Sequence, residues 1–299
     1  NWISESPRMQ QATEKVLEAT NDLKKTYKDL KVRRCTYSRS WQEVLIASSD
    51  GTFARDIRLY QTTGLNVLAA NKQNRSSISR RYGTSSKPCD LQDWDTEKSA
   101  LDICESAKKM LDAKYVEAGQ MPAVLANKFG GVIFHEACGH LLETTQIERG
   151  TSPFADKLNK QIANVALSAK DEGITNSAFG SLSIDDEGMP PQNTILIKDG
   201  ILKHFISDRA GELRTGYPRT GSGRRQNYSF AAASRMRNTY ICPGNFYPHE
   251  IIQSIDNGLY CKSMGGGSVG PTGQFNFSVE EGYLIKNGQL DKPVKGATL

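Results

Sequence analysis

The chain has 299 residues, 37% of them hydrophobic and 24% charged, values typical of a globular protein large enough for two domains. No run approaches the roughly 18 consecutive apolar residues of a membrane span. The net charge of +5 is spread along the chain, and no dense basic block indicates direct nucleic-acid binding.

The N-terminus and the cysteines indicate a cytoplasmic protein. Residues 1–8 lack the basic and then apolar layout of a secretion signal, and the missing initiator methionine predicts a chain that starts inside a longer gene product. The six cysteines are scattered without a Cys-x-x-Cys pair. This spacing favours reduced, mostly buried thiols over a disulfide framework.

Residues 1–117 are predicted to form an α+β unit with an antiparallel sheet. Apolar spacing indicates an amphipathic helix over 9–29 and a second helix over 96–114, capped by Asp95 or Thr96. The polar segment 71–93 is expected to be a loop or ragged strand. Between the first helix and this segment, β-branched and aromatic runs predict four strands, over 32–37, 43–47, 53–60 and 65–70, with a hairpin turn at Ser49-Asp-Gly51.

Residues 118–299 are predicted to form a β-rich domain that carries one special helix, over about 132–145. A short strand over 123–126 precedes this helix, whereas 157–170 fits either helix or strand. From Ser181 onward turn signals alternate with short strands. Two similar hairpins are expected, one around Asp199-Gly200 and one around Asn287-Gly288.

His135, Glu136 and His140 are the most informative residues. The chain has only four histidines, and these two bracket a glutamate within six positions. Neutral imidazoles are good zinc ligands, and an adjacent carboxylate can accept a proton from a metal-activated water. The pattern therefore indicates a metallohydrolase centre, and the alternative is a buried helix with two hydrogen-bonded histidines.

The spacing of the two histidines is unusual. In the common zincin motif they stand four residues apart, on one helix face, whereas five residues rotate the second ring by about 140° from the first. A π-bulge would bring the rings together, and Gly139 makes local distortion easier. Cys138 inside the motif is expected to be a small buried residue. His204 is expected to be structural and His249 to lie at the surface.

Several separated motifs, taken together, resemble the TldD/PmbA family, whose members are known as modulators of DNA gyrase. The motif helix is one of them, and the resemblance spans nearly all of residues 30–299. The matching segments are His135-Glu-Ala-Cys-Gly-His-Leu-Leu-Glu143, Asp186-Glu-Gly188, Ile197-Lys-Asp-Gly-Ile-Leu202, Gly223-Arg-Arg225, Arg235-Met-Arg-Asn-Thr-Tyr240, Gly265-Gly-Gly267 and Pro293-Val-Lys-Gly-Ala-Thr-Leu299.

The resemblance implies a cytoplasmic, TldD-type zinc metallopeptidase subunit that cleaves unfolded or extended peptides. It implies that His135 and His140 bind Zn²⁺, that Glu136 is the general base, and that the subunit forms a homo- or hetero-oligomer with a TldE/PmbA-type partner. It also implies a fragment, inactive alone, that lacks an N-terminal domain and a C-terminal Cys-Gly-Lys region. The third zinc ligand would be a cysteine of that region, beyond Leu299.

Other polar residues are candidates for supporting roles. Glu143 is either a partner that holds an imidazole or a simple helix-end carboxylate. A further group is expected to hold substrate backbone or stabilise an oxyanion, unless its members form only salt bridges and sheet-edge hydrogen bonds. That group is Arg224, Arg225, Tyr228, Arg235 and Asn238.

The sequence leaves two classes of function open. The first is a zinc-dependent peptidase, favoured by Glu136. The second is a non-catalytic binding or regulatory subunit that acts on gyrase or on a toxin–antitoxin protein. Neither class requires a membrane or direct contact with nucleic acid.

Overall fold

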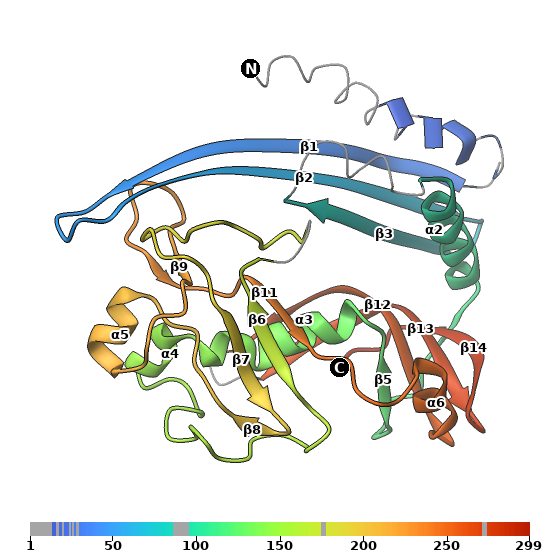
Figure 1. Ribbon diagram of the computed structural model, residues 1–299. Coiled ribbons are helices and arrows are strands. Elements are labelled where there is room, and N and C mark those ends of the chain that lie inside the picture. Colours follow the sequence, from blue (N-terminus) through green and yellow to red (C-terminus); the bar gives the residue numbers. More distant parts are fainter. Residues whose placement is uncertain are drawn as a thin grey trace.

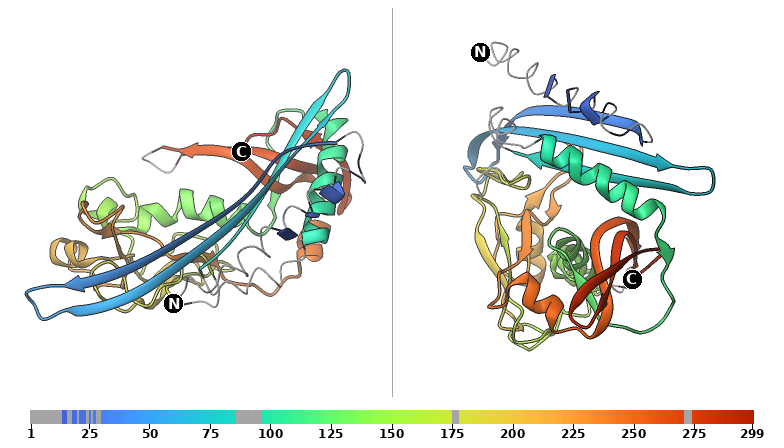
Figure 2. Two further views of the ribbon diagram at one scale, coloured as in Figure 1. Left: turned by 90° about the horizontal axis from the view of Figure 1, so that it is seen from above. Right: turned by 90° about the vertical axis from the view of Figure 1, so that its right-hand side faces the viewer.

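The computed structural model describes residues 14–15, 18–19, 21–23, 25, 27, 30–85, 96–174, 178–270 and 274–299. A three-stranded antiparallel sheet arches over two further sheets, and the motif helix lies between those two (Figures 1 and 2). The predicted α+β class is confirmed. Within the segment 9–29, the described residues from Glu14 to Lys25 are helical. The proposed cap Asp95 lies outside the described residues.

The first sheet contains β1 (Leu30–Ala47), β2 (Phe53–Ala70) and β3 (Arg75–Thr84), paired in that order. Four strands were expected before residue 71, but they form two long ones, and the expected loop at 71–93 contains the regular strand β3. Polar residues within β1 and β2 do not end the strands, because partners across the sheet satisfy them. The Tyr37 hydroxyl, for example, donates to Gln61 Oε1 at 2.8 Å.

Helix α2 (Thr96–Leu111) covers one face of this sheet and supplies much of its core. The expected apolar stripe is buried: Ala100, Ile103, Cys104, Ala107 and Met110 are at most 4% exposed. The helix ends at Leu111, before the expected Lys114, because Lys114 already belongs to a strand of the next sheet. Within the described residues, no helix has both the length and the apolarity needed to cross a membrane.

The second sheet has five strands in the order β4-β14-β13-β12-β5. Its outer strands pair in parallel with their neighbours, and its inner pairs are antiparallel. At the expected hairpin, Asn287 (φ 49°) and Gly288 (φ 72°) both have left-handed backbone, as a two-residue hairpin turn requires. The strands are β4 (Lys114–Tyr115), β5 (Ala123–Leu125), β12 (Asn257–Val269), β13 (Phe275–Lys286) and β14 (Gln289–Lys295).

The third sheet has the order β11-β6-β7-β8. The other expected hairpin lies here, with Asp199 (φ 50°) and Gly200 (φ 78°) in its turn. Within 157–170, turns continue until a strand begins at Ala169. The strands are β6 (Ala169–Glu172), β7 (Asn193–Lys198), β8 (Ile201–Leu202) and β11 (Asn238–Ile241), and β9 (Gly223–Arg224) pairs separately with β10 (Ala233–Ser234).

Two short helices, α5 (Arg209–Thr215) and α6 (Pro248–Gln253), lie in the region expected to hold only turns and strands. The signal for α5 was present in the sequence. Asp208 accepts a hydrogen bond from the Gly211 amide at 2.9 Å, and Gly216 ends the helix with φ 76°. Such an acidic N-cap and a left-handed glycine are typical of helix ends.

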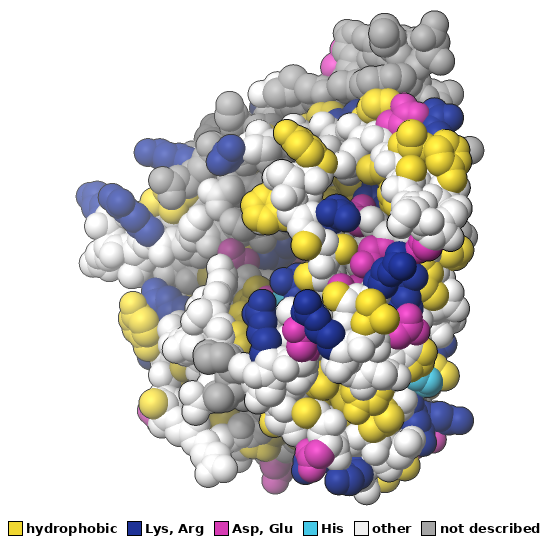
Figure 3. Space-filling view, turned by 90° about the vertical axis from the view of Figure 1, so that its left-hand side faces the viewer, with side chains coloured by type: hydrophobic (Ala, Val, Ile, Leu, Met, Phe, Trp, Pro, Cys, Tyr) yellow, Lys and Arg dark blue, Asp and Glu magenta, His cyan; other side chains and the backbone are white. Residues whose placement is uncertain are grey.

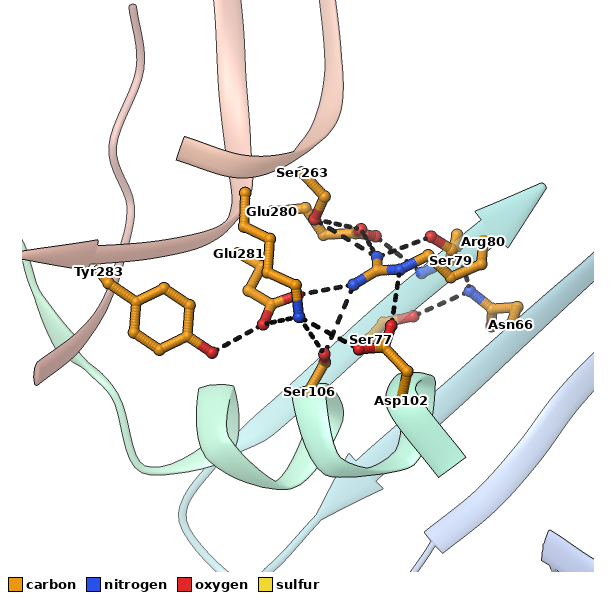
Figure 4. A network of polar contacts seen from close by, with 11 residues as sticks. Asn66, Ser77, Ser79, Arg80, Asp102, Ser106, Ser263, Glu280, Glu281 and Tyr283 are labelled. Carbon is orange, nitrogen blue, oxygen red and sulfur yellow. Dashed lines mark hydrogen bonds and ion pairs between the residues drawn. The ribbon is translucent and has the colours of Figure 1, made fainter. Parts of the chain in front are cut away.

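A polar network joins the first sheet to α2 and to the second sheet (Figure 4). Its centre is Glu281 on β13, a fully buried side chain. One carboxylate oxygen lies 2.6 Å from Arg80 Nη2 on β3, and the other accepts from Lys262 at 3.0 Å and from the Tyr283 hydroxyl at 2.7 Å. Lys262 also reaches Asp102 on α2 at 3.2 Å. Three parts of the fold therefore meet at one carboxylate.

Candidate metal centre

The metal motif is not one helix over 132–145 but three pieces. Helix α3 (Phe129–Ala137) is followed by a 3₁₀ turn (Gly139–Leu142) and by α4 (Thr144–Glu148). Cys138 separates the first two pieces with φ −129° and ψ −52°, outside the helical region. The structure thus differs from the expected π-bulge. The helix ends, and the tighter turn carries the second histidine back toward the first.

Gly139 makes this break possible because the neighbouring chain approaches it closely. A Cβ atom at Gly139 would lie 2.3 Å from the sulfur of Met236, and Gly139 itself is buried. Met236 and Phe134 belong to the same hydrophobic cluster. Packing against Met236, in the segment between β10 and β11, therefore stabilises the break between α3 and the 3₁₀ turn.

The break places the two imidazoles side by side. The ring centroids of His135 and His140 lie 4.7 Å apart with an interplanar angle of 83°. Together with Glu136 they offer one ligand atom each, all within 4.8 Å of one another, and no other such cluster is present among the described residues. These donors fit Zn²⁺, which prefers imidazole nitrogen and carboxylate oxygen.

The protonation of the histidines differs. Burial and the nearby His140 lower the pKa of His135, which favours the neutral ring that can bind a metal. The hydrogen bond to Glu143 raises the pKa of His140, against the effect of burial. The other ring nitrogen of His140, Nε2, lies 3.8 Å from Glu136 Oε2.

Glu143 lies beneath His140, and its side chain is 1% exposed. Its Oε1 lies 3.1 Å from His140 Nδ1, and its Oε2 accepts from Arg235 Nη1 at 2.7 Å. The backbone here is fixed by Ile206, whose carbonyl accepts from the Thr144 amide at 2.9 Å. Of the two interpretations of Glu143, the geometry favours the partner of an imidazole.

A cavity of about 500 Å³ opens beside His135. Strand β2 contributes Arg58 and Tyr60 to its wall, and the segment from β9 to β11 contributes three of the candidate residues, Arg224, Arg235 and Asn238. Figure 3 shows a face that is hollowed near its middle, where a histidine side chain lies between Lys or Arg side chains. The cavity therefore reaches the metal motif at His135.

The remaining candidates are arranged differently. Tyr228 is 95% exposed, and neither it nor Arg225 lines this cavity. Arg225 instead donates to the Phe230 carbonyl. Asn238 lines the cavity, but its amide holds the fold: its oxygen accepts from the Gly180 amide at 2.8 Å, and its nitrogen donates to the Glu172 carbonyl at 3.0 Å.

Arg58 and Tyr60 were not expected at the site. Arg58 is buried and donates to Asp186 Oδ1 at 2.5 Å and to the Ile184 carbonyl at 2.9 Å. Tyr60 packs against Phe179, and burial raises the pKa of its hydroxyl. The residue spacing within β2 does not predict that Arg58 and Tyr60 line the cavity. Their contacts, with Asp186 and Phe179, join residues more than a hundred positions apart.

The other histidines lie as expected, whereas Cys138 is half-buried and not fully buried as predicted. His204 Nδ1 is 2.8 Å from the Ile195 carbonyl within its own hairpin, and His249 is exposed and stacked on Tyr247. Burial raises the pKa of the Cys138 thiol to about 12, so it remains protonated at neutral pH. A protonated thiol is a poor zinc ligand.

The motif and the sheets around it form a candidate metal-binding centre. Residues 4–111 match the PmbA/TldA metallopeptidase central domain, and residues 118–299 match the PmbA/TldA metallopeptidase C-terminal domain. The chain belongs to this PmbA/TldD family.

Three similar proteins illustrate the relationship. The "Metalloprotease TldD homolog" of Haemophilus influenzae is 38% identical over 276 residues, which cover 88% of this chain and 56% of that protein. The "Zinc metalloprotease TldD homolog" of Saccharolobus solfataricus is 35% identical over 180 residues, 60% of this chain and 40% of that protein. TldE from Thermococcus kodakarensis has the same fold, with a TM-score of 0.82 and 20% identity over 94% of this chain and 63% of TldE. The chain spans about half the length of the curated relatives it matches.

Proposed function

We propose that this chain is the metal-binding part of a zinc-dependent peptidase of the TldD type. The observation that carries the proposal is the convergence of His135, Glu136 and His140 within 4.8 Å beside a cavity. The name of the Saccharolobus solfataricus relative supports zinc as the metal. His135 and His140 would hold the ion through ring nitrogens.

Zinc held at this position supplies Lewis-acid chemistry, which makes a water acidic enough to ionise near pH 7. Glu136 accepts the proton of the attacking water and then delivers it to the leaving amine. The neutral ring of His135 and the anchored ring of His140 keep their nitrogens directed at the site. The substrate is an unfolded or extended peptide, cleaved at its main chain.

The cavity wall supports the choice of substrate. Strand β11 lies at the edge of the third sheet and lines the cavity, so an extended peptide could pair with it through main-chain hydrogen bonds. Arg224 and Arg235 supply positive charge on the same wall. We further propose that the protein works in the cytoplasm with a TldE/PmbA-type partner, a class to which its structural neighbour TldE belongs.

The test uses the full-length protein with its partner subunit, zinc analysis and cleavage of an unfolded peptide. Glu136→Gln should keep bound zinc and lose roughly 10²–10⁴-fold in cleavage rate, the usual contribution of a general base. His135→Ala and His140→Ala should lose zinc as well. The matched control is Glu148→Ala on α4, whose carboxylate pairs only with Arg214 at the surface and should leave both readouts unchanged.

Two outcomes would overturn the proposal. Wild-type protein that binds zinc yet cleaves no peptide would indicate a binding or regulatory subunit instead. A wild-type cleavage rate in Glu136→Gln would show that Glu136 is not the general base.

A further inference from the structure

We propose that Arg235 is a positioning residue that holds the carboxylate of Glu143 against His140, and that this carboxylate fixes the tautomer of His140. The inference rests on the proposed function only in taking His140 as a metal ligand. It assigns to Arg235 a role other than substrate or oxyanion binding. Arg235 would act on the metal site without touching either the ion or the peptide bond.

The chain of contacts is short and largely buried. Arg235 Nη1 donates to Glu143 Oε2 at 2.7 Å and to its neighbouring Ser234 carbonyl at 2.9 Å. Glu143 is 1% exposed in its side chain, whereas Arg235 is 42% exposed. The second carboxylate oxygen lies 3.1 Å from His140 Nδ1. Residues 92 positions apart in sequence are therefore joined through one carboxylate.

The donor and acceptor chemistry of these groups leaves one arrangement. A guanidinium only donates hydrogen bonds and a carboxylate only accepts them, so His140 Nδ1 must carry the hydrogen. The lone pair of the neutral ring is then on Nε2, the nitrogen 3.8 Å from Glu136 Oε2. A metal can bind only through that lone pair.

The backbone beside Arg235 is held in place by helix α4 of the motif. The neighbouring Ser234 is fully buried, and its hydroxyl accepts from the Thr145 amide at 3.0 Å and lies 2.8 Å from the Thr145 hydroxyl. Arg235 also lines the cavity beside His135. The same side chain thus belongs to the substrate wall and to the support of the metal ligand.

Replacing the carboxylate by an amide makes the role of Arg235 visible. A glutamine at position 143 has one oxygen and one NH₂ group. Arg235 can donate only to the oxygen, so the NH₂ group must face His140 and donate to Nδ1. The hydrogen of the ring then moves to Nε2, where it blocks metal binding. Removing Arg235 as well releases the amide to turn its oxygen toward the ring.

The experiment reads the tautomer directly, by ¹⁵N NMR of histidine-labelled, metal-free protein at about pH 9, where imidazoles are neutral. The wild type should show His140 with the hydrogen on Nδ1, and Glu143→Gln should show it on Nε2. The double variant Glu143→Gln with Arg235→Met should return signal to the Nδ1 form. Zinc affinity should fall roughly 10–100-fold in Glu143→Gln and recover in part in the double variant.

The control is Arg214→Met, which removes a surface Arg–Glu pair near the motif and should change neither tautomer nor affinity. An unchanged tautomer in Glu143→Gln would overturn the proposal, and so would a double variant that stays in the Nε2 form. Should Glu143→Gln fail to fold, Arg235→Lys is the second variant. Its point charge holds the carboxylate less firmly, so zinc affinity should fall, and wild-type affinity would overturn the proposal.

The two proposals can fail separately. The tautomer is measured without zinc or peptide, so a correct tautomer pattern with no cleavage would defeat only the peptidase. Cleavage that depends on Glu136, together with an unchanged tautomer in Glu143→Gln, would defeat only the role of Arg235.

Discussion

Two buried glutamates, Glu143 and Glu281, have similar surroundings but opposite consequences. Each is fully buried, and each has an arginine nitrogen 2.6–2.7 Å from its carboxylate, Arg235 in one case and Arg80 in the other. Glu281 accepts its other hydrogen bonds from Lys262 and Tyr283 (Figure 4). We call Glu281, Arg80, Lys262 and Tyr283 the closed cluster, because the last three residues are all partners of Glu281. The other oxygen of Glu143 contacts Nδ1 of His140, whose far nitrogen, Nε2, lies 3.8 Å from Glu136 Oε2.

The comparison shows how one interaction serves two purposes. A buried carboxylate is costly unless its oxygens are hydrogen-bonded, and at both sites each oxygen has a partner. Around Glu281 the partners come from β3, β12 and β13, so the pairing fastens separate parts of the fold. Around Glu143 one partner, His140, has a second ring nitrogen, and under the proposed function the pairing directs that nitrogen at the metal. On this proposal the free ring nitrogen, not the ion pair, distinguishes the two sites.

The largest expected effect comes from removing the centre of the closed cluster. Glu281→Ala should lower the free energy of unfolding by about 3–5 kcal/mol, because Arg80, Lys262 and Tyr283 would each lose a hydrogen bond to a buried carboxylate. Arg80 would keep its contact with Glu280, and Lys262 its contact with Asp102. Urea unfolding measures the loss. The control Glu43→Ala breaks a surface pair with Arg55 and should cost at most about 1 kcal/mol. Equal losses of unfolding free energy in the two variants would contradict the role of Glu281 in joining separate parts of the fold.

A smaller effect should follow from changing the break in the motif helix. Gly139→Ala places a methyl group against the Met236 sulfur and should lower stability by about 1–3 kcal/mol, while weakening zinc binding through displacement of His140. The control Gly131→Ala lies in α3 with nothing within 4 Å of the added carbon. It should raise stability by up to about 1 kcal/mol, since alanine favours helix. Thermal unfolding should show a lower stability for Gly139→Ala and a higher one for Gly131→Ala. A change in the same direction for both would refute the argument that Gly139 is packed against Met236.

Local features of the sequence predicted much of this structure. The apolar stripe of α2 and the two left-handed hairpin turns follow from spacing and from residue type, which act over a few positions. The metal motif was visible for the same reason: His135, Glu136 and His140 are neighbours in sequence. Glycine at 139 indicated a distortion, but the kind of distortion depended on Met236, nearly a hundred residues later.

What the sequence did not predict depends on distant partners. For Arg235 the sequence left both a substrate contact and a salt bridge open, because nothing near it in sequence shows that Glu143 lies beside it. Arg58, Tyr60 and Glu281 carried no local signal at all. The long strands β1 and β2 were divided for a related reason, since polar residues end a strand only when no partner across the sheet satisfies them.

The smallest predicted effect concerns the pH dependence of the closed cluster. Burial lowers the pKa of Lys262, but its hydrogen bond to Glu281 and the charges of Glu281 and Asp102 outweigh burial and raise it overall. The charged form is therefore favoured in the folded state. Its contribution to stability should be complete below the unfolded pKa of about 10.4 and should disappear as pH rises through the higher folded value.

Unfolding of the wild type and of Lys262→Met, compared from pH 8 to pH 11, would measure this contribution. The difference between the two proteins should be constant up to about pH 10 and then shrink. Tyr283, whose pKa burial also raises, is present in both proteins and largely cancels. Lys198→Met, at an exposed position, should give a flat difference throughout. A flat difference for Lys262→Met too would mean that its ammonium group adds nothing to the closed cluster, in which Arg80 and Tyr283 would then be the partners that stabilise Glu281.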